Sequence, residues 1–447
     1  MKRTSTLCAL LALVLGVMAQ GDFKVTTLQY EQLPDMNHAR MSHIIFPSGD
    51  GFVVIGGHTT GFDREASAEI FENGTWRDLP TPHYVHDGGG SAILDDGRVL
   101  IFGGHNGGWG TGGGNAGIDV YNPSSQTFSD GGQMASGKAF ARGVVLDGKV
   151  YISGDYWTAY YGSTPQPVEV WQGVGTTTLP GLPAYSYTYH YVCPKSDGSA
   201  FLMVDNIAGF YYYGSDYDPT LLDKVSITDG VTNPVHVALF STWTPMGVTD
   251  AVRTPDYAIG DGRYLMVCSH NVEKRYAVVM LDADAEEATL VCELPNVVGE
   301  SLVEWTNNLL VNTARKEAYV VTAGLNNEYT YTYYIATIDY EQGVVKEVSC
   351  ASGFSFRCGN PGLALMSDGR ILCTGGSETS TSNFDPHAHA LAFVPNSGIT
   401  DNISTTSAAS AQRATYYDLL GKPSSPASRG ILIVRSADGS ARKVFVP

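Results

Sequence analysis

The feature that most constrains this chain is a hairpin signal that returns about every 50 residues. Asp-Gly stands between two apolar stretches six times, at Asp50-Gly51, Asp96-Gly97, Asp147-Gly148, Asp197-Gly198, Asp261-Gly262 and Asp368-Gly369. This is a strong hairpin signal, because Gly adopts the positive φ that tight β-turns need. The successive gaps are 46, 51, 50, 64 and 107 residues, and the last is about twice the others. We therefore expect a further unit inside that gap, with its turn at Arg315-Lys316-Glu317, and seven units in total.

Each unit has room for four strands. The second apolar stretch ends in a pair of small residues, at Gly56-Gly57, Gly103-Gly104, Ser153-Gly154, Ala323-Gly324 and Gly375-Gly376. Small residues there let neighbouring sheets approach closely. Two more strand-like stretches follow in most units, for example Ala68–Phe71 and Thr75–Leu79. Four strands in about 50 residues are typical of a propeller blade. The high glycine content and the 16% of charged residues exclude a disordered chain and an ordinary helical bundle.

The units resemble those of the kelch family. The matching pieces are the apolar run with its glycine pair, as in Val99–Gly104, and later aromatics such as Tyr121 and Phe128 or Phe71 and Trp76. The resemblance covers residues 23–397 and is stronger in units one, two, three and seven than in units four to six. It implies an all-β, seven-bladed kelch-type β-propeller. Kelch propellers perform many functions, so the resemblance says more about fold than about activity.

The two ends of the repeat region predict how the ring closes. The last unit runs from Leu391–Val394 into Ser and Thr without a fourth strand, and Phe23–Leu28 has no unit of its own. We expect this N-terminal strand to pair into the last blade, which would remove an exposed sheet edge. The propeller would then span residues 22–397. Residues 398–415 form a Ser/Thr-rich linker, and residues 416–447 form a C-terminal segment.

The first nineteen residues predict an exported protein. Residues 1–19 combine Lys2 and Arg3 with the apolar run Leu7–Leu15 and small residues before a cut after Ala19. This is typical of a signal peptide, and it is shorter than a membrane span of about 20 apolar residues. We find no other candidate transmembrane segment. The net charge of −18 and the lack of a basic run exclude nucleic-acid binding.

Six cysteines follow the signal, at Cys193, Cys268, Cys292, Cys350, Cys358 and Cys373. Disulfides are open to an exported protein, but several of these cysteines lie in apolar strand-like runs. We expect buried free thiols.

The C-terminal segment resembles the sorting tail of exported Bacteroidetes proteins. It opens with Tyr416–Pro423, continues with Gly430–Arg435 and ends with Arg442–Val446, and the resemblance covers about the last 35 residues. It implies type IX secretion, with the outer-membrane secretion machinery as a partner and a secreted or cell-surface location. The alternative is a small β-appendage that packs on the propeller.

The loops after the second strands are the candidate ligand face, because a propeller keeps chemistry in its loops. Exposed aromatics beside Asp and Asn suit sugar recognition, with rings against C–H surfaces and polar groups on hydroxyls. The candidates are His105, Asn106 and Trp109 in one loop, Asp155, Tyr156 and Trp157 in the next, and Asp205 and Tyr211 in a third. The alternative is that these aromatics pack the long loops onto the propeller.

Titratable residues occupy equivalent places directly after successive second strands. They are His58, His105, Asp155, Asp205 and His270. A ring of that radius is too wide for one metal ion. It is open to acid/base chemistry, although hydrogen-bonding caps for the loops are the alternative that we favour.

The best metal candidate by spacing is Asp385-Pro386-His387-Ala388-His389. Alternate residues of a strand share a face, so Asp385, His387 and His389 would converge. No fourth ligand stands beside them, which favours a surface strand with outward polar residues.

These features favour a secreted or cell-surface binding propeller that recognises a glycan or a partner protein and needs no cofactor. The alternative is a carbohydrate-active enzyme that performs epimerase- or mutarotase-like acid/base chemistry on a sugar. A copper radical oxidase that resembles galactose oxidase is the weaker alternative. Tyr189-His190 resembles one of its ligand pairs, but Met41 stands where its cross-linked Tyr would fall.

Overall fold

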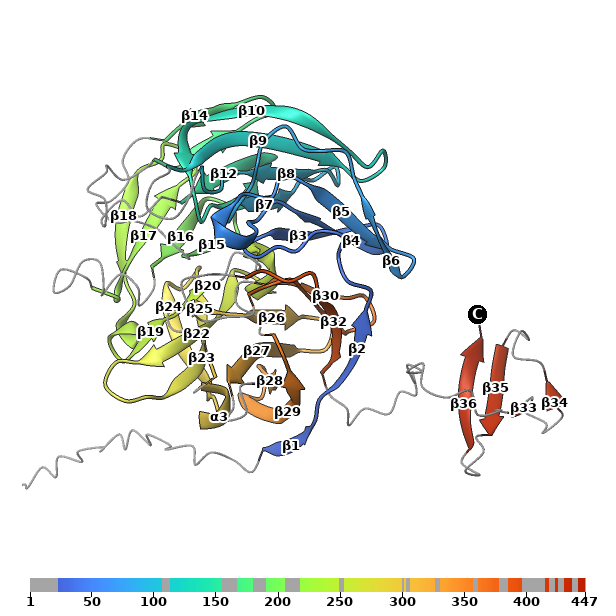
Figure 1. Cartoon of the computed structure of the whole chain (residues 1–447). Helices are drawn as coiled ribbons and strands as arrows, with labels where there is room; N and C mark the ends of the chain where they lie inside the picture. The colour runs from blue at the N-terminus through green and yellow to red at the C-terminus, as the bar shows by residue number, and fades with distance from the viewer. Residues whose placement is uncertain are drawn as a thin grey trace, which may run out of the picture.

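A computed structural model describes most of the chain from residue 23 onward (Figure 1). The described residues are 23–106, 113–154, 167–179, 190–205, 218–248, 253–299, 301–302, 306–325, 330–356, 361–377, 385–395, 415–417, 423–424, 430–435 and 441–446. The predicted signal peptide at residues 1–19 and almost all of the predicted linker at residues 398–415 lie outside them.

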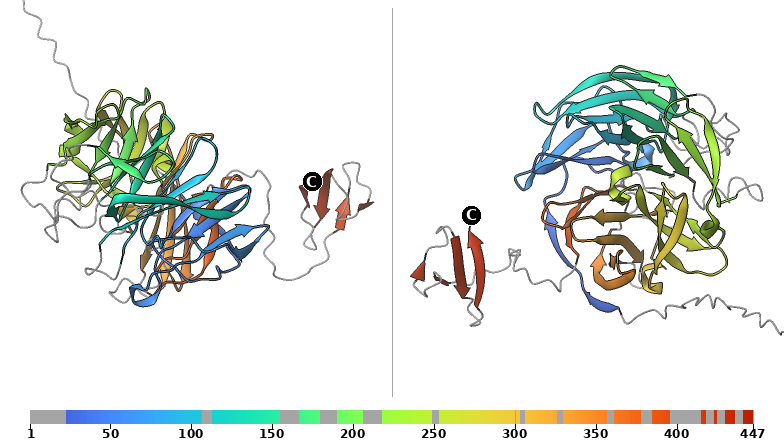
Figure 2. Two further views of the ribbon diagram at one scale, coloured as in Figure 1. Left: turned by 90° about the horizontal axis from the view of Figure 1, so that it is seen from above. Right: turned by 180° about the vertical axis from the view of Figure 1, so that it is seen from behind.

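Seven antiparallel sheets follow one another round a ring, and the all-β propeller is confirmed (Figures 1 and 2). Blade I consists of β3 (Ile44–Ser48), β4 (Gly51–Ile55), β5 (Ala68–Glu72) and β6 (Thr75–Asp78). Blade II consists of β7 (Gly90–Ile93), β8 (Val99–Phe102), β9 (Asn115–Asn122) and β10 (Thr127–Lys138). Blade III consists of β11 (Arg142–Leu146), β12 (Lys149–Ser153), β13 (Glu169–Trp171) and β14 (Thr176–Thr178).

The remaining blades repeat this order. Blade IV consists of β15 (Tyr191–Pro194), β16 (Ala200–Val204), β17 (Leu221–Ser226) and β18 (Thr232–His236). Blade V consists of β19 (Trp243–Pro245), β21 (Ala258–Gly260), β22 (Arg263–His270), β23 (Tyr276–Asp282) and β24 (Glu287–Glu293). Blade VI contains β26 (Leu309–Asn312), β27 (Glu317–Leu325), β28 (Tyr331–Asp339) and β29 (Val344–Phe354). Blade VII contains β30 (Gly362–Leu365), β31 (Ile371–Thr374) and β32 (Ala390–Val394).

The seven predicted turns all join paired strands. Ser48 pairs with Gly51 across the first turn, Leu146 with Lys149 across the third, and Asn312 with Glu317 across the turn without Asp-Gly. These turns lie at one end of the blades, which we call the turn face. The segments after the second strands lie at the other end, which we call the loop face.

The ring closes with a different strand from the one we expected. The stretch Phe23–Leu28 contains β1 (Lys24–Thr27), which pairs in parallel with β29 and extends blade VI. The following strand, β2 (Gln29–Leu33), pairs antiparallel with β32 and completes blade VII. The expectation of N-terminal closure is therefore right, but its strand assignment is wrong. The chain bends after Thr27, so two short strands serve two neighbouring blades.

The glycine pairs let neighbouring blades approach, as expected. A Cβ on Gly56 would lie 1.9 Å from the carbonyl oxygen of His86, in the segment that enters the next blade. A Cβ on Gly103 would lie 2.5 Å from the carbonyl oxygen of Lys138. Both glycines also have a positive φ, so any side chain there would be strained.

Blade V departs from the regular pattern, because its first strand is interrupted. After β19 the chain leaves the sheet, forms the short β20 (Gly247–Val248) beside β25 (Thr306–Asn307), and returns through the 3-10 turn η4 (Thr254–Tyr257) to β21. The η4 turn contacts the inner strands β11, β15 and β26, so it lies in the middle of the ring. The Tyr257 hydroxyl bonds to both the backbone nitrogen and the carbonyl oxygen of Val192, at 3.0 Å each. This excursion plugs the channel.

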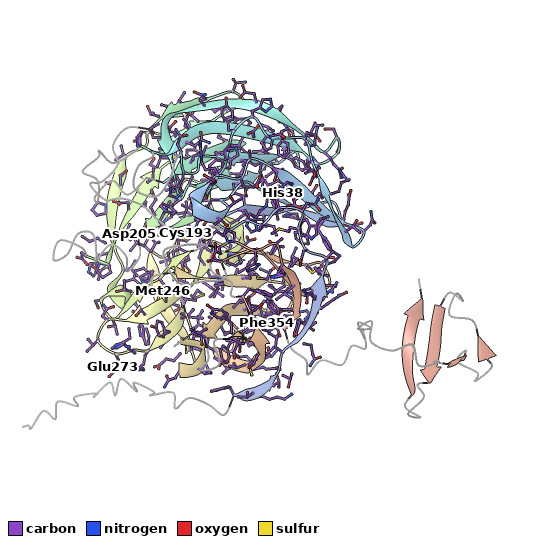
Figure 3. The ribbon with its side chains drawn as sticks, in the orientation of Figure 1. His38, Cys193, Asp205, Met246, Glu273 and Phe354 are labelled. Carbon is purple, nitrogen blue, oxygen red and sulfur yellow. The ribbon has the colours of Figure 1, made fainter. Side chains whose placement is uncertain are left out.

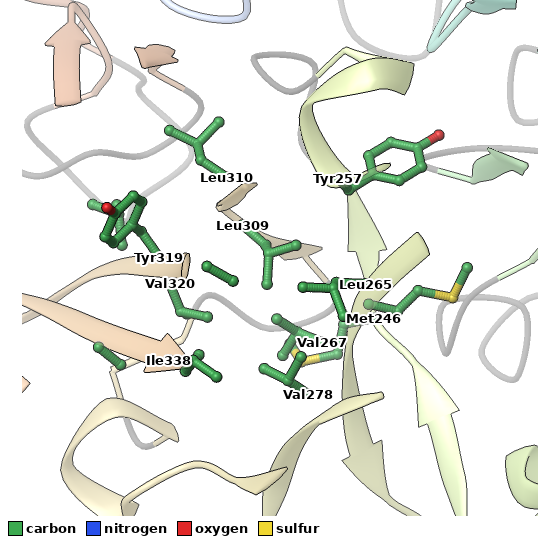
Figure 4. Packing of buried hydrophobic residues seen from close by; sticks show 14 of the residues in the cluster. Met246, Tyr257, Leu265, Val267, Val278, Leu309, Leu310, Tyr319, Val320 and Ile338 are labelled. Atoms are coloured by element: carbon green, nitrogen blue, oxygen red, sulfur yellow. The ribbon is translucent and has the colours of Figure 1, made fainter. Parts of the chain in front are cut away.

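Two kinds of interior hold the blades together. One large apolar cluster extends through blades IV to VII, and Figure 4 shows Leu265, Val267, Val278, Leu309 and Val320 gathered in it. Blades I to III contribute to smaller, separate clusters. Cys193, Cys268, Cys292, Cys350 and Cys373 are free thiols, as expected, whereas Cys358 lies outside the described residues.

The C-terminal segment contains a sheet of its own. Its strands are β33 (Thr415–Tyr417), β34 (Pro423–Ser424), β35 (Gly430–Arg435) and β36 (Ala441–Val446), in the order β34-β33-β35-β36. Within the described residues, we find no helix that is long and apolar enough to cross a membrane.

Candidate ligand face

Five of the ten residues that we assigned to a ligand face lie in described parts of the chain. They are His58, His105, Asn106, Asp205 and His270. Trp109, Asp155, Tyr156, Trp157 and Tyr211 lie outside the described residues, as does Tyr189. The loop face can therefore be built from the ends of the second strands and the bases of the loops.

His58 and His105 come together across the junction of blades I and II. His58 Nδ1 lies 2.8 Å from the Asp87 carboxylate, and both side chains are buried. The backbone nitrogen of His105 donates to the carbonyl oxygen of Asp87 at 2.6 Å. The His105 ring stands edge-on to Phe140, with 4.8 Å between ring centroids. Burial, opposed by the nearby Asp87 charge, lowers the pKa of His105, so the ring is neutral at neutral pH.

Similar bonds join other blades at the same level. His43, just before β3, lies with Nε2 3.0 Å from the Thr374 hydroxyl at the end of β31. His190, just before β15, lies with Nε2 2.7 Å from the Ser153 hydroxyl at the end of β12. Burial, followed by the charges of Arg40, His387 and His58, holds the pKa of His43 well below its ordinary value. These histidines tie an inner strand to the second strand of the preceding blade.

His270 and Asp205 occupy the ends of their strands without meeting the histidines of blades I and II. His270 Nδ1 accepts hydrogen bonds from the backbone nitrogens of Val272 and Glu273, at 3.3 and 3.1 Å, and so caps the turn after β22. Its ring lies edge-on to Trp243. Asp205 follows β16 and is half-buried (Figure 3).

Sequence analysis missed Arg64, which lies at the rim beside these residues. Its backbone forms an isolated bridge with His58, and its Nη1 donates to Asn106 Oδ1 at 3.0 Å. Both side chains are exposed. The bond joins the loop of blade I to the loop of blade II. The signal in the sequence was a lone arginine six residues after His58.

Sequence analysis also missed three buried ion pairs under the loop face. Their carboxylates lie at equivalent places in the third strands of blades I to III, at Glu69, Asp119 and Glu169. Their partners are the guanidinium of Arg40 (3.0 Å), the imidazole of His86 (3.1 Å) and the ammonium group of Lys138 (3.4 Å). Among the described residues, these are the only ion pairs with both side chains fully buried. An acidic residue inside an otherwise apolar stretch, 50 residues apart each time, was the available signal.

Each carboxylate also accepts two consecutive backbone amides from the segment that carries its cation. Glu69 accepts from Asn37 and His38, Asp119 from His83 and Tyr84, and Glu169 from Ala135 and Ser136. Burial raises the pKa of Asp119, but the hydrogen bond and charge of His86, with the bonds from His83, bring it below its ordinary value. Burial likewise raises the pKa of Glu169, but the charge of Lys138 and several hydrogen bonds bring that pKa below its ordinary value.

The segment that is the best metal candidate by spacing does not have the strand geometry that both interpretations assumed. Strand β32 begins only at Ala390, so Asp385, His387 and His389 precede it. The rings of His387 and His389 both lie against Phe356, with centroid distances of 4.6 and 4.5 Å, and His389 Nδ1 lies 3.1 Å from Asp35. Asp385 is exposed. No group of three or more His, Cys, Asp or Glu suited to a metal ion occurs among the described residues.

Comparisons with known proteins support the fold. No family model and no curated protein matches the chain. Among solved structures, a fungal alcohol oxidase of the AA5 family, described as having catalytic diversity and in complex with copper, is similar over 94% of this chain and all of its own. The identity is 11% and the TM-score 0.54. A structure named YjhT covers 80% of this chain and 95% of its own, at 11% identity and a TM-score of 0.41. At 11% identity the likeness to the alcohol oxidase shows the propeller fold alone.

Copper does not fit the described residues of this chain. His190 is fully buried and is bonded to Ser153, and Met41, fully buried, forms a backbone bridge with His58. Neither brings a set of ligands together. We therefore derive no copper chemistry for this propeller.

Proposed function

We propose that this protein is an exported, kelch-type binding propeller that recognises a glycan through its loop face. The proposal rests on the aromatic and polar composition of the loops and on the rigid strand ends that carry them. Support for export comes from residues 1–19 and from the sorting-like tail at residues 416–447.

The observation that carries the choice of binding over catalysis is the use of the ring histidines. His58 bonds to Asp87, and His270 caps its own turn. His105 has a pKa lowered by burial and packs against Phe140. A general acid/base works best with a pKa near the working pH and with access to substrate. Histidines bound into junctions and turns serve better as a frame than as a proton-transfer array.

A glycan array with the purified protein tests this function. We expect binding without turnover, and loss of binding in Trp109→Ala, Trp157→Ala or Asn106→Ala. The matched control is Arg98→Ala, because Arg98 lies in the Asp96-Gly97 turn on the turn face, paired with Asp96. An array without a single bound glycan contradicts the proposal, and capture of a protein partner by the same face would replace it.

Acid/base catalysis on a sugar is the second candidate. It is favoured by the buried His58–Asp87 hydrogen bond beside His105, since a carboxylate that orients an imidazole is a common part of general-base sites. NMR of candidate sugars with the protein would detect epimerisation or anomer exchange. Turnover that is lost in His105→Ala would support the enzyme, and its absence over the whole array would support the binding function.

Export has its own test. Removal of residues 416–447 should hold the protein inside the producing cell envelope if the tail is a sorting segment. Cell fractionation measures this, and unchanged secretion would instead make the tail a simple appendage.

A further inference from the structure

The base of the blade I loop holds Arg64 in a defined place. The Thr59 backbone nitrogen and hydroxyl both donate to the Asp63 carbonyl oxygen, at 2.7 and 3.2 Å. The Glu65 nitrogen donates to the Gly57 carbonyl oxygen at 2.8 Å, so the loop is bonded on both sides of Arg64. An exposed arginine usually loses side-chain entropy when it binds a ligand. Part of that cost is met here in advance, because Asn106 already holds the side chain.

Among the described residues, no carboxylate neutralises the charge of Arg64. No carboxylate oxygen of these residues lies within 4.0 Å of its guanidinium, and the guanidinium donates to the neutral amide of Asn106. Seven other arginines of the described chain do pair with carboxylates, among them Arg77, Arg98, Arg275 and Arg370. An exposed cation with a neutral partner, on the face that carries the ligand loops, is the unusual feature.

The geometry of the bond determines which ligand group fits. Nη1 is used by Asn106, so the Nε–Nη2 edge is available, and this edge offers two parallel N–H donors. Such an edge matches a carboxylate, which accepts both bonds at once. We propose that Arg64, positioned by Asn106, binds the carboxylate of an acidic glycan at the junction of blades I and II. This inference rests on the proposed function and names the class of glycan.

The net charge of −18 is compatible with this ligand. At physiological ionic strength the Debye length is about 8 Å, so distant carboxylates on the turn face are screened from the site. The neighbouring His105 is neutral because burial lowers its pKa. Arg64 is therefore a cation that a ligand meets at this part of the rim, next to the exposed carboxylate of Asp63.

The test compares uronic-acid oligosaccharides with the same oligosaccharides after chemical reduction of each carboxylate to a primary alcohol. Binding to the full protein is measured by titration calorimetry. We expect the carboxylate form to bind more tightly, and Arg64→Ala to weaken it by about 10- to 100-fold, as for loss of a charge-assisted bidentate pair. Arg64→Lys should recover part of the affinity, because it keeps the charge without the planar fork. Asn106→Ala should weaken carboxylate binding more than binding of the reduced form.

Each outcome decides the matter. Arg98→Ala serves as the control, with the same loss of charge on the opposite face. Equal binding of both forms, unchanged in Arg64→Ala, overturns this inference and leaves glycan binding intact. Failure of both forms, and of every neutral glycan on the array, overturns the inference and the proposed function together.

Discussion

Blades I to III and blades IV to VI are built on the same four-strand plan, but their interiors differ. In the first group, fully buried ion pairs join each third strand to the segment that enters the same blade. In the second group, one large apolar cluster contains residues of all three blades. Apolar burial stabilises strongly and without direction, whereas a buried ion pair adds little net stability but requires one geometry. The comparison teaches that one propeller can hold its blades in two ways. Directional ion pairs fix the positions of the strands in blades I to III, and apolar burial stabilises blades IV to VI.

The largest expected difference between the halves is in acid. The carboxylates of Asp119 and Glu169 have lowered pKa values, so their contribution is complete above their ordinary pKa and is lost as the pH falls through the native values. Burial lowers the pKa values of the buried His43 and the half-buried His105, so their contribution is lost as the pH falls below about 6.5. All four lie in blades I to III.

We therefore expect acid to open blades I to III before blades V and VI. Peptide-resolved hydrogen exchange from pH 7 to pH 4, corrected for intrinsic rates, measures the order. Earlier exchange in β22, β23 and β27 would contradict it.

Removal of one partner of a buried pair should have the next largest effect. Glu69→Gln leaves the Arg40 guanidinium buried without its carboxylate, so we expect the free energy of unfolding to fall by about 3–5 kcal/mol. Denaturant titration measures the loss.

A double variant sharpens this result. Arg40→Met with Glu69→Leu should recover most of the loss, because a well-packed apolar pair often replaces a buried ion pair at little cost. Blade VII already carries Leu391 at the equivalent place, paired with Cys373 two residues before Gly375. If the double variant is as unstable as Glu69→Gln, the ion pair itself contributes to stability and an apolar pair cannot replace it.

In the apolar half, a single truncation should cost less. Leu265 is fully buried in the large cluster, and Leu265→Ala should lower the free energy of unfolding by about 3 kcal/mol through lost burial and a cavity. Hydrogen exchange should locate the loss in blades IV to VI. An equal rise in hydrogen exchange in β5 and β9 would contradict the conclusion that the two groups of blades have separate interiors.

The smallest effect is expected when one partner of these buried carboxylates replaces another. His86 Nδ1 lies 2.8 Å from the Gly103 carbonyl oxygen and Nε2 lies against Asp119, so both nitrogens face acceptors. Lys138 fills the equivalent place in blade III and donates to the Pro167 carbonyl oxygen. His86→Lys should therefore change the free energy of unfolding by less than about 1.5 kcal/mol. His86→Leu, which leaves Asp119 without this cation, should cost clearly more, and equal thermal midpoints for the two would contradict the equivalence.

Much of the fold was predictable because its signal is local. An Asp-Gly turn between apolar runs determines a hairpin within about ten residues. Gly56 and Gly103 indicate close contacts between blades, because a side chain at either position would collide with the neighbouring backbone. The plug in blade V was less predictable. Its only sign in the sequence was the 64-residue gap between Asp197 and Asp261. That gap indicates an insertion of extra residues, but it does not indicate that they fold into the channel. Likewise, nothing local separates β1 from β2, since partner strands are more than 300 residues away.

The candidate site was less predictable than the fold. Equivalent positions placed His58 and His105 on one face, but the bond to Asp87 depends on how two blades meet. Arg64 was missed because an isolated arginine belongs to no sequence motif. Its position at the rim depends on the hydrogen bond to Asn106 in the next blade. The spacing of Asp385, His387 and His389 assumed a strand that begins only at Ala390.

The pairing of β2 with β32 has a consequence for biogenesis. Residues 29–33 are among the first blade strands to leave the ribosome, yet their partners at residues 390–394 are among the last propeller strands to be made. The early blades must therefore assemble as an open arc, and closing a loop of that length carries an entropic penalty that only the finished arc can offset. Until residues 390–394 have been made, the growing propeller is therefore an arc with two free blade edges instead of a closed ring.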